Sequence, residues 1–320
     1  MKNIFLFLFI TVLFVSCKQD SKLEKEISKI EMSATIERFD LAFANAKPSQ
    51  LQELKDAFPF MFSKKYADSF WIAKMQDTIQ IELNKEVKKV FPDLNLVEGE
   101  VKSLFQHIKY YFPEFKTPRL VSATSFVDYR NKVIVTDTIS LIAIDTYLGS
   151  DHHFYEGIQK YISRTFTQDN IVIDLASEYA QAYIFPKKNK TFLDEMIYFG
   201  KQLYFKDLMI PFKTDAERIG YAQEQLDWAK TNEAQIWAYF VERELLYSTD
   251  PNLLNRFINP APFSKFQLVE IDRESPGRIG QYIGWQIVKA YMENNSVSLK
   301  EMLIKDAEEI FNKSRFKPEL

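Results

Sequence analysis

The side chains best suited to metal or acid–base chemistry are three histidines, His107, His152 and His153. Neutral imidazole is a common zinc ligand and a common general base. His152 and His153 are adjacent, so on a helix they point about 100° apart and cannot easily hold one ion together. We therefore expect both to be structural residues at a helix start. His107 stands alone in an amphipathic helix, and we expect it at the surface or its boundary.

Several common chemistries lack their parts in this chain. It has no P-loop, no dinucleotide-binding glycine pattern and no Gly-x-Ser-x-Gly elbow, and its only cysteine is Cys17. Nucleotide and acyl-transfer reactions are therefore not indicated. The chain carries 41 Lys and Arg against 44 Asp and Glu. This mildly acidic balance argues against nucleic acid as a partner.

One segment is comparable with the zinc site of zincin peptidases. Those enzymes carry His-Glu-x-x-His on a helix, where two imidazoles one turn apart hold zinc and the Glu acts on the metal-bound water. The predicted helix over 170–184 places Ser177 and Gln181 at the imidazole positions and keeps only Glu178. A third ligand, a Glu on the next helix, corresponds to Phe199. The comparison predicts a degenerate site without metal or other cofactor.

A second segment, residues 275–288, gathers three of the eight glycines. Gly280 and Gly284 are four apart, so on a helix they form a smooth stripe that lets another helix or a ligand approach closely. Glycine costs about 1 kcal/mol in a helix interior. Its repeated use favours tight packing over an approached ligand. We treat Arg278, Gln281 and Trp285, with the two glycines, as a candidate packing or interaction segment.

The first residues indicate export. About a dozen apolar residues follow Lys2, which is too short to span a bilayer but typical of a secretory signal peptide. We predict a signal peptide over 1–16 and lipid attachment at Cys17. An ordinary signal peptide or an uncleaved anchor is the alternative. Because no second cysteine exists, no internal disulfide can form. The mostly polar residues that follow predict a tether over 17–34.

Residues 35–320 predict a single domain, because no Gly/Ser/Pro-rich linker interrupts them. The fold class is α+β, predominantly helical, with a small, largely antiparallel sheet from short Val-, Ile- and Thr-rich runs. The runs lie at 119–125, 132–136 and 139–145, with a turn at 128–131 between the first two, and the short alternating segment 36–40 is a further candidate strand. Helical periodicity after Gly149 predicts helices at 152–165, 170–184, 191–208, 215–229, 232–248, 251–258, 277–294 and 298–312. The 28 phenylalanines and 16 tyrosines can fill a core or cover a protein-binding face.

The chain resembles the GldB family of gliding motility lipoproteins of Bacteroidota over essentially its whole length. The resemblance rests on the signal that ends at Cys17 and on residues 36–40, 148–155, 195–201, 236–242, 245–250 and 275–285. It implies a zincin-like fold and a part in the envelope machinery for gliding, which is bound up with type IX secretion. It carries over no catalytic residue.

Three hypotheses follow. The first is a non-catalytic, lipid-anchored scaffold whose partners are other gliding motility and type IX secretion proteins, in the outer membrane facing the periplasm. The second is a peptidase or peptidoglycan hydrolase that uses Glu178. The third is an assembly factor with transient contacts. In all three we expect the functional surface between the helices at 170–184, 191–208 and 277–294.

Overall fold

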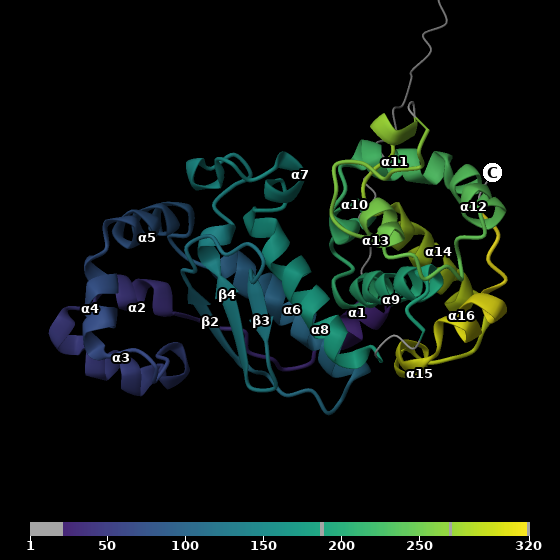
Figure 1. The fold of residues 1–320 in the computed structure, drawn as a ribbon. Helices are drawn as coiled ribbons and strands as arrows, with labels where there is room; N and C mark the ends of the chain where they lie inside the picture. Colours follow the sequence, from purple (N-terminus) through teal and green to yellow (C-terminus); the bar gives the residue numbers. More distant parts are fainter. Residues whose placement is uncertain (1–21, 186–188, 269–270, 319–320) are drawn as a thin grey trace, which may run out of the picture.

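The protein consists of a half that contains the sheet and a helical half beside it (Figure 1). The computed structural model describes residues 22–185, 189–268 and 271–318. The strands are β1 (Ile36–Arg38), β2 (Arg119–Ala123), β3 (Val133–Val135) and β4 (Ile139–Ala143). The helices of the sheet-containing half are α1 (Lys22–Ile27), α2 (Phe39–Asn45), α3 (Leu51–Ala57), α4 (Asp68–Gln76), α5 (Thr78–Val90), α6 (Asn95–Tyr111), α7 (Lys160–Ser163) and α8 (Ile171–Tyr183). The helical half holds α9 (Phe192–Met209), α10 (Asp215–Ile219), α11 (Gln223–Thr231), α12 (Glu233–Glu242), α13 (Asn252–Phe257), α14 (Ile279–Asn294), α15 (Leu299–Ile304) and α16 (Ala307–Ser314).

The sheet has four strands in the order β1-β2-β4-β3. β1 pairs with β2 and β2 with β4 in parallel, while β3 pairs with β4 antiparallel. The predicted α+β class is confirmed, but the sheet is mixed rather than largely antiparallel. The physical reason is the long connection from β1 through α2–α6, because parallel neighbours need a crossover. The turn predicted at 128–131 leads into β3, which pairs with β4 and not with the preceding strand.

Both faces of the sheet are buried, and this fixes the position of α8. Strand side chains alternate between the two faces. Leu120 and Ile142 lie in the main core with α6 and α8, whereas Val121 belongs to a smaller cluster with α2 and α3. Tyr179 of α8 shares a 2.7 Å hydrogen bond with the buried Ser140 hydroxyl. The helix is therefore held against one face of the sheet, and its opposite side turns toward the helical half.

The glycines predicted to form a stripe bring α14 against α9. A Cβ added at Gly284 would lie 1.8 Å from the Met196 carbonyl oxygen, and one at Gly200 would lie 2.3 Å from the Gly284 carbonyl oxygen. A Cβ at Gly280 would lie 2.9 Å from Cδ1 of Ile258. The stripe is therefore a packing surface, against helix backbone at Gly284 and against the Ile258 side chain and the Phe257 carbonyl oxygen at Gly280.

The other residues of the 275–288 segment divide between packing and the surface. Trp285 is fully buried, and its indole Nε1 donates to Asp207 Oδ2 at 2.7 Å. The buried Gln281 donates through Nε2 to the Ile258 carbonyl oxygen at 2.8 Å. Arg278, which precedes α14, is half-buried and reaches into a cleft described below.

Two of the predicted helices are interrupted at glycines with left-handed backbone. In place of one helix over 152–165 there is only α7, and Gly157 before it has φ +90°. The helix predicted over 215–229 is broken at Gly220, where φ of +71° ends α10 before α11 begins. Glycine adopts this conformation readily and other residues rarely do. The loop at Gly220 lines the cleft described below, as do α7 and the residues after it.

The described part of the predicted tether packs on α6 through α1 and the residues that follow it. Ile27 is 1% exposed. Gln106 donates through Nε2 to the carbonyl oxygens of Ser28, at 3.0 Å, and Ile30, at 2.8 Å. Cys17 and the predicted signal peptide, 1–16, lie outside the described residues. Within the described ranges, no helix is both long and apolar enough to cross a membrane.

The histidines occupy other environments than the sequence suggested. His107 is buried rather than at the surface, with Nδ1 2.8 Å from the Ser103 carbonyl oxygen and Nε2 3.2 Å from a Glu24 carboxylate oxygen. It lies beneath α1, whose docking removes it from solvent. His152 and His153 stack on each other, 4.4 Å between ring centroids, beside a short 3₁₀ turn rather than at the start of a long helix.

Candidate functional site

The residues compared with a zinc site point in different directions. Ser177 lines the cleft between the two halves, and its hydroxyl donates to the Ile173 carbonyl oxygen at 2.9 Å. Glu178 and Gln181 line a separate pocket next to β3, where Gln181 Nε2 donates to Glu178 Oε1 at 2.9 Å. Phe199 packs against the main core and lines neither cavity. The described residues bring no three His, Cys, Asp or Glu side chains together as a metal site.

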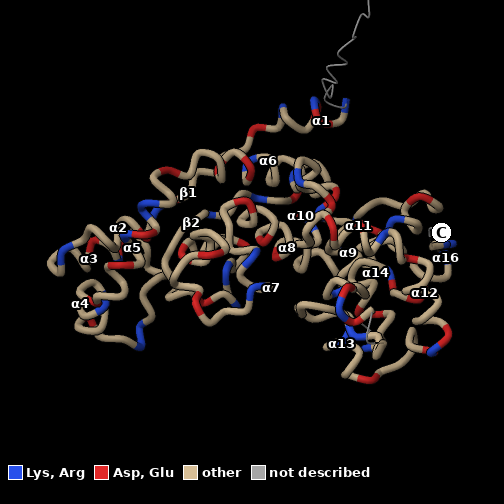
Figure 2. Tube along the Cα trace, turned by 90° about the horizontal axis from the view of Figure 1, so that it is seen from above, with Lys and Arg blue, Asp and Glu red and all other residues tan. Residues whose placement is uncertain are grey.

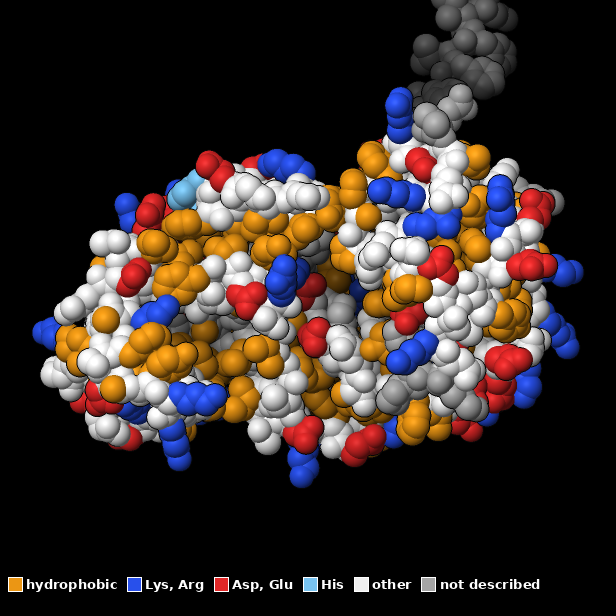
Figure 3. Space-filling model, in the orientation of Figure 1, with side chains coloured by type: hydrophobic (Ala, Val, Ile, Leu, Met, Phe, Trp, Pro, Cys, Tyr) orange, Lys and Arg blue, Asp and Glu red, His pale blue; other side chains and the backbone are white. Residues whose placement is uncertain are grey.

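The cleft that Ser177 lines has a volume of about 770 Å³ and lies between the two halves. Figure 3 shows the molecule hollowed there, with apolar side chains along the walls. Its floor is one face of α8, formed by Asn170, Ile173, Asp174 and Ser177 at helical spacing. The opposite wall comes from the helical half, including Lys206 of α9 and the loops around α10 and before α14.

Basic side chains outnumber acidic ones in this cleft. Its lining contains Arg130, Lys132, Lys160, Arg164, Lys206, Arg218 and Arg278, against Asp151, Asp174 and Glu217. From above, basic segments lie beside α7, on the edge of the sheet-containing half that faces the helical half (Figure 2). The cleft is therefore cationic although the whole chain is slightly acidic.

Three of the seven basic residues have carboxylate partners. Lys132 Nζ lies 2.5 Å from Asp174 Oδ2, and Lys160 pairs with Asp151. Arg218 binds two carboxylates of the helical half. For the other four no carboxylate lies within 4.0 Å in the part of the chain that the structure describes: Arg130, Arg164, Lys206 and Arg278. Such uncompensated charges inside a cleft are costly unless a ligand balances them.

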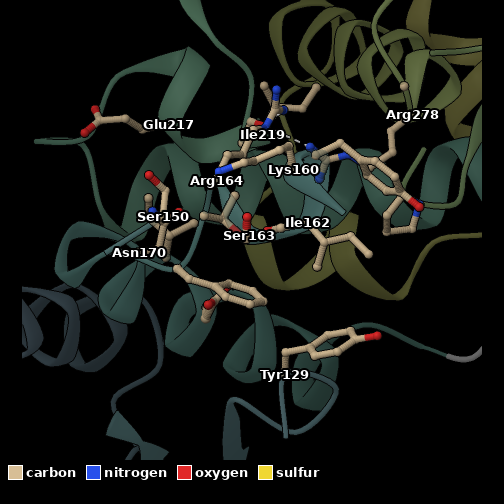
Figure 4. A pocket seen from close by; sticks show the side chains of 18 of the residues that line it. Tyr129, Ser150, Lys160, Ile162, Ser163, Arg164, Asn170, Glu217, Ile219 and Arg278 are labelled. Atoms are coloured by element: carbon tan, nitrogen blue, oxygen red, sulfur yellow. Dashed lines mark hydrogen bonds between the residues drawn. The ribbon is translucent and has the colours of Figure 1, made fainter. Parts of the chain in front are cut away.

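Arg164 and Arg278 meet at one carbonyl group. Arg278 Nη2 donates to the Gly220 carbonyl oxygen at 2.9 Å, and Arg164 Nη2 donates to the same oxygen. Figure 4 shows the two side chains reaching the same region of the cleft, with Glu217 pointing away from them. Burial lowers the pKa of both guanidinium groups, and the charge of Arg278 lowers that of Arg164 further. Both remain charged, since arginine loses its proton only far above neutral pH.

A left-handed backbone at Arg278, a ring contact and hydrogen bonds hold the two arginine side chains in place. Arg278 adopts φ +65° as the residue before α14, and its guanidinium lies over the Tyr221 ring at 5.6 Å. The Tyr221 hydroxyl in turn donates to the Gly277 carbonyl oxygen at 2.6 Å. Arg164 Nη1 donates to Gln225 Oε1 at 2.5 Å. The pair is thus held in place before any ligand arrives.

Lys206 lies beneath this pair and is 7% exposed. Its Nζ donates to the Arg218 carbonyl oxygen. Burial is the main cause that lowers the Lys206 pKa, to about 8. The ammonium group is therefore mostly protonated at neutral pH and adds a third positive charge to this part of the cleft.

The sequence reading missed most of these residues. Lys206 carried a usable signal, because it lies in a predicted helix next to the apolar Phe205 and one turn after the apolar Leu203. Arg164 carried none, since it follows the short α7 in an irregular loop. Arg278 was singled out only as part of the glycine segment.

A family model described as "Gliding motility protein GldB" matches residues 20–318. The chain belongs to the GldB family. No curated protein and no solved structure matches the chain. The family assignment confirms the resemblance to gliding motility lipoproteins, and the zincin-like part of that comparison remains a prediction. The 275–285 segment that carried the resemblance supplies Arg278 to the cleft.

Proposed function

We propose that the protein is a lipid-anchored, non-catalytic component of the gliding motility machinery, associated with type IX secretion. The lipid on Cys17 holds it in the outer membrane facing the periplasm, and the cationic cleft binds a partner protein of that machinery. The family match supports the place in motility. One observation carries the binding role: Arg164 and Arg278 converge in a large cleft without a carboxylate partner among the described residues.

The geometry also supports the non-catalytic reading. Ser177 and Glu178 face different cavities, and Phe199 faces neither. A zincin site needs these positions around one point, because the base must reach the metal-bound water.

A hydrolase that uses Glu178 is the second candidate. Glu178 is half-buried in its pocket, and burial raises its pKa above the ordinary value, as a general acid requires. In the described residues its carboxylate is bonded to Gln181 and to no cation. This arrangement motivates a direct test.

The test places Cys17→Ala and Glu178→Gln in the gene of the gliding bacterium and measures colony spreading at equal protein levels. We expect Cys17→Ala to leave the membrane fraction and to abolish spreading, and Glu178→Gln to spread like the parent. Loss of spreading in a folded Glu178→Gln protein supports the hydrolase instead. Full spreading by Cys17→Ala contradicts the role of the lipid anchor.

A further inference from the structure

We propose that the cleft binds an extended acidic peptide segment of a partner protein, with a carboxylate of that segment seated between Arg164 and Arg278. This inference rests on the proposed function, because it names the ligand chemistry of the partner-binding cleft. It depends on three features: free donors on the arginine pair, internal carboxylates that are already paired, and apolar walls.

The arginine pair keeps donors for a ligand. A guanidinium has five N–H donors in a planar fork that matches the two oxygens of a carboxylate. Among the described residues, the Arg278 side chain donates one hydrogen bond, through Nη2, and Arg164 donates through its two Nη atoms. The cleft lining contains a further buried donor, Arg218 Nε, for which the described residues supply no acceptor. An entering carboxylate can therefore form charge-assisted bonds without displacing an internal one.

The three carboxylates of the cleft are already engaged, and Glu217 accepts from the backbone amide and the hydroxyl of Thr214. Asp174 accepts from the Tyr147 hydroxyl at 2.8 Å and pairs with Lys132. Asp151 is occupied by Lys160 at the exposed rim. The field of Asp174 reaches Arg278 and Lys206 and raises the pKa of each, yet burial still lowers both. A net positive charge therefore remains where the two arginines meet.

The remaining lining favours a peptide over a small anion. Apolar and aromatic side chains surround the charges, from Tyr129, Tyr161, Ile162, Ile219, Pro262 and Phe263. A cleft of about 770 Å³ holds several residues of an extended chain and far exceeds one phosphate ion. Phe263 is 40% exposed, so apolar surface is open to a ligand. A positively charged site surrounded by apolar surface fits a peptide in which acidic residues alternate with apolar ones.

Full-length protein, extracted in detergent and immobilised, is exposed to a randomised mixture of eight-residue peptides with free terminal carboxylates. A matched mixture lacks Asp and Glu and is amidated at the C-terminus. Mass spectrometry identifies the retained peptides. We expect retained peptides to be enriched at least several-fold in Asp and Glu next to apolar residues. We expect the mixture without carboxylates to wash off the immobilised protein.

Arg164→Met and Arg278→Met each test the site, and Arg243→Met is the matched control on an exposed surface outside the cleft. We expect at least a tenfold loss of affinity for the best retained peptide in each cleft variant and none in the control. If Arg278→Met does not fold, as judged by circular dichroism, Arg164→Met decides. Equal retention by the cleft variants, or no enrichment of acidic peptides, overturns the proposal.

Two competitors distinguish other sources of negative charge. Inorganic phosphate, or vesicles that contain phosphatidylglycerol, could bind the same arginines. Arginine-dependent binding of either one without binding of acidic peptides overturns the peptide assignment. The two proposals fail separately. If the protein binds acidic peptides but its loss does not affect colony spreading, this inference stands and the role in motility is rejected.

Discussion

Gly284→Ala is expected to force apart the two helices that position the cleft. The added Cβ would lie 1.8 Å from the Met196 carbonyl oxygen, where real Cβ contacts are at least 3.0 Å. The neighbour is backbone on α9, so it cannot turn aside as a flexible side chain can. The helices must separate by more than about 1 Å, in an interior packed like an organic crystal.

The magnitude follows from two opposing contributions. Overpacking a core costs about 1–3 kcal/mol, and more where rigid backbone must move. Replacing glycine in a helix interior returns about 1 kcal/mol of helix propensity. We expect a net loss of about 3 kcal/mol in the free energy of unfolding. For a chain of this size that lowers Tm by roughly 6 °C.

Thermal unfolding followed by circular dichroism measures the effect, with Gly99→Ala as the matched control. Gly99 lies inside α6, and an added Cβ there would meet nothing within 4 Å. The control should gain about 1 kcal/mol from helix propensity alone. The reasoning is refuted if Gly284→Ala unfolds at or above the Tm of the parent. Because Arg278 and Lys206 belong to the two separated segments, the variant should also lose acidic peptide binding.

Two further predictions concern the buried lysine and the N-terminal segment. Burial lowers the Lys206 pKa to about 8, whereas a lysine in an unfolded chain has a pKa of about 10.4. Between these two pH values the unfolded state binds more protons than the folded state, so the free energy of unfolding rises with pH across that window. Urea unfolding between about pH 7.5 and 10.5 measures this rise, and Lys206→Met should remove up to about 3 kcal/mol of it. Lys201, whose pKa is also about 8, keeps its own contribution in the variant. An unchanged rise in the free energy of unfolding contradicts the assignment to Lys206. Gln106→Ala should increase amide hydrogen exchange over residues 22–30, because it removes both side-chain hydrogen bonds from α6 to that segment. The substitution of an exposed residue of the same helix, Lys102→Ala, should not. Equal protection of residues 22–30 in the two variants would count against these docking contacts.

The predictable parts of the fold are those specified locally. The helix over 191–208 appears as α9, whose first turn is capped by Thr191 and Asp194 in reciprocal hydrogen bonds. The spacing of Gly280 and Gly284 predicted a closely packed helix face, although the sequence did not show which helix packs there. Local pattern located the strands as well. It did not give their order, because pairing β1 with β2 depends on contacts about 80 residues apart.

The cleft was predictable only in outline. The sequence placed a functional surface between the helices at 170–184, 191–208 and 277–294. The cleft takes a face of the first helix, but only Lys206 from α9 and Gly277 and Arg278 before α14, and most of its other residues lie in loops and short helices. Its charge was not visible, because Arg164, Lys206 and Arg278 are widely separated in the chain and become neighbours only after the two halves pack. The comparison with a zinc site drew attention to Glu178 instead, and that side chain faces the other side of α8.

The most direct test of a binding role for the cleft is colony spreading with Arg164 and Arg278 both replaced by Met in the chromosomal gene. Immunoblots and membrane fractionation must show parental protein levels and anchoring, and Arg243→Met serves as the control. We predict that the double variant fails to spread while the control spreads normally. Normal spreading by a stable, anchored double variant would contradict the claim that the protein acts in gliding through this cationic cleft.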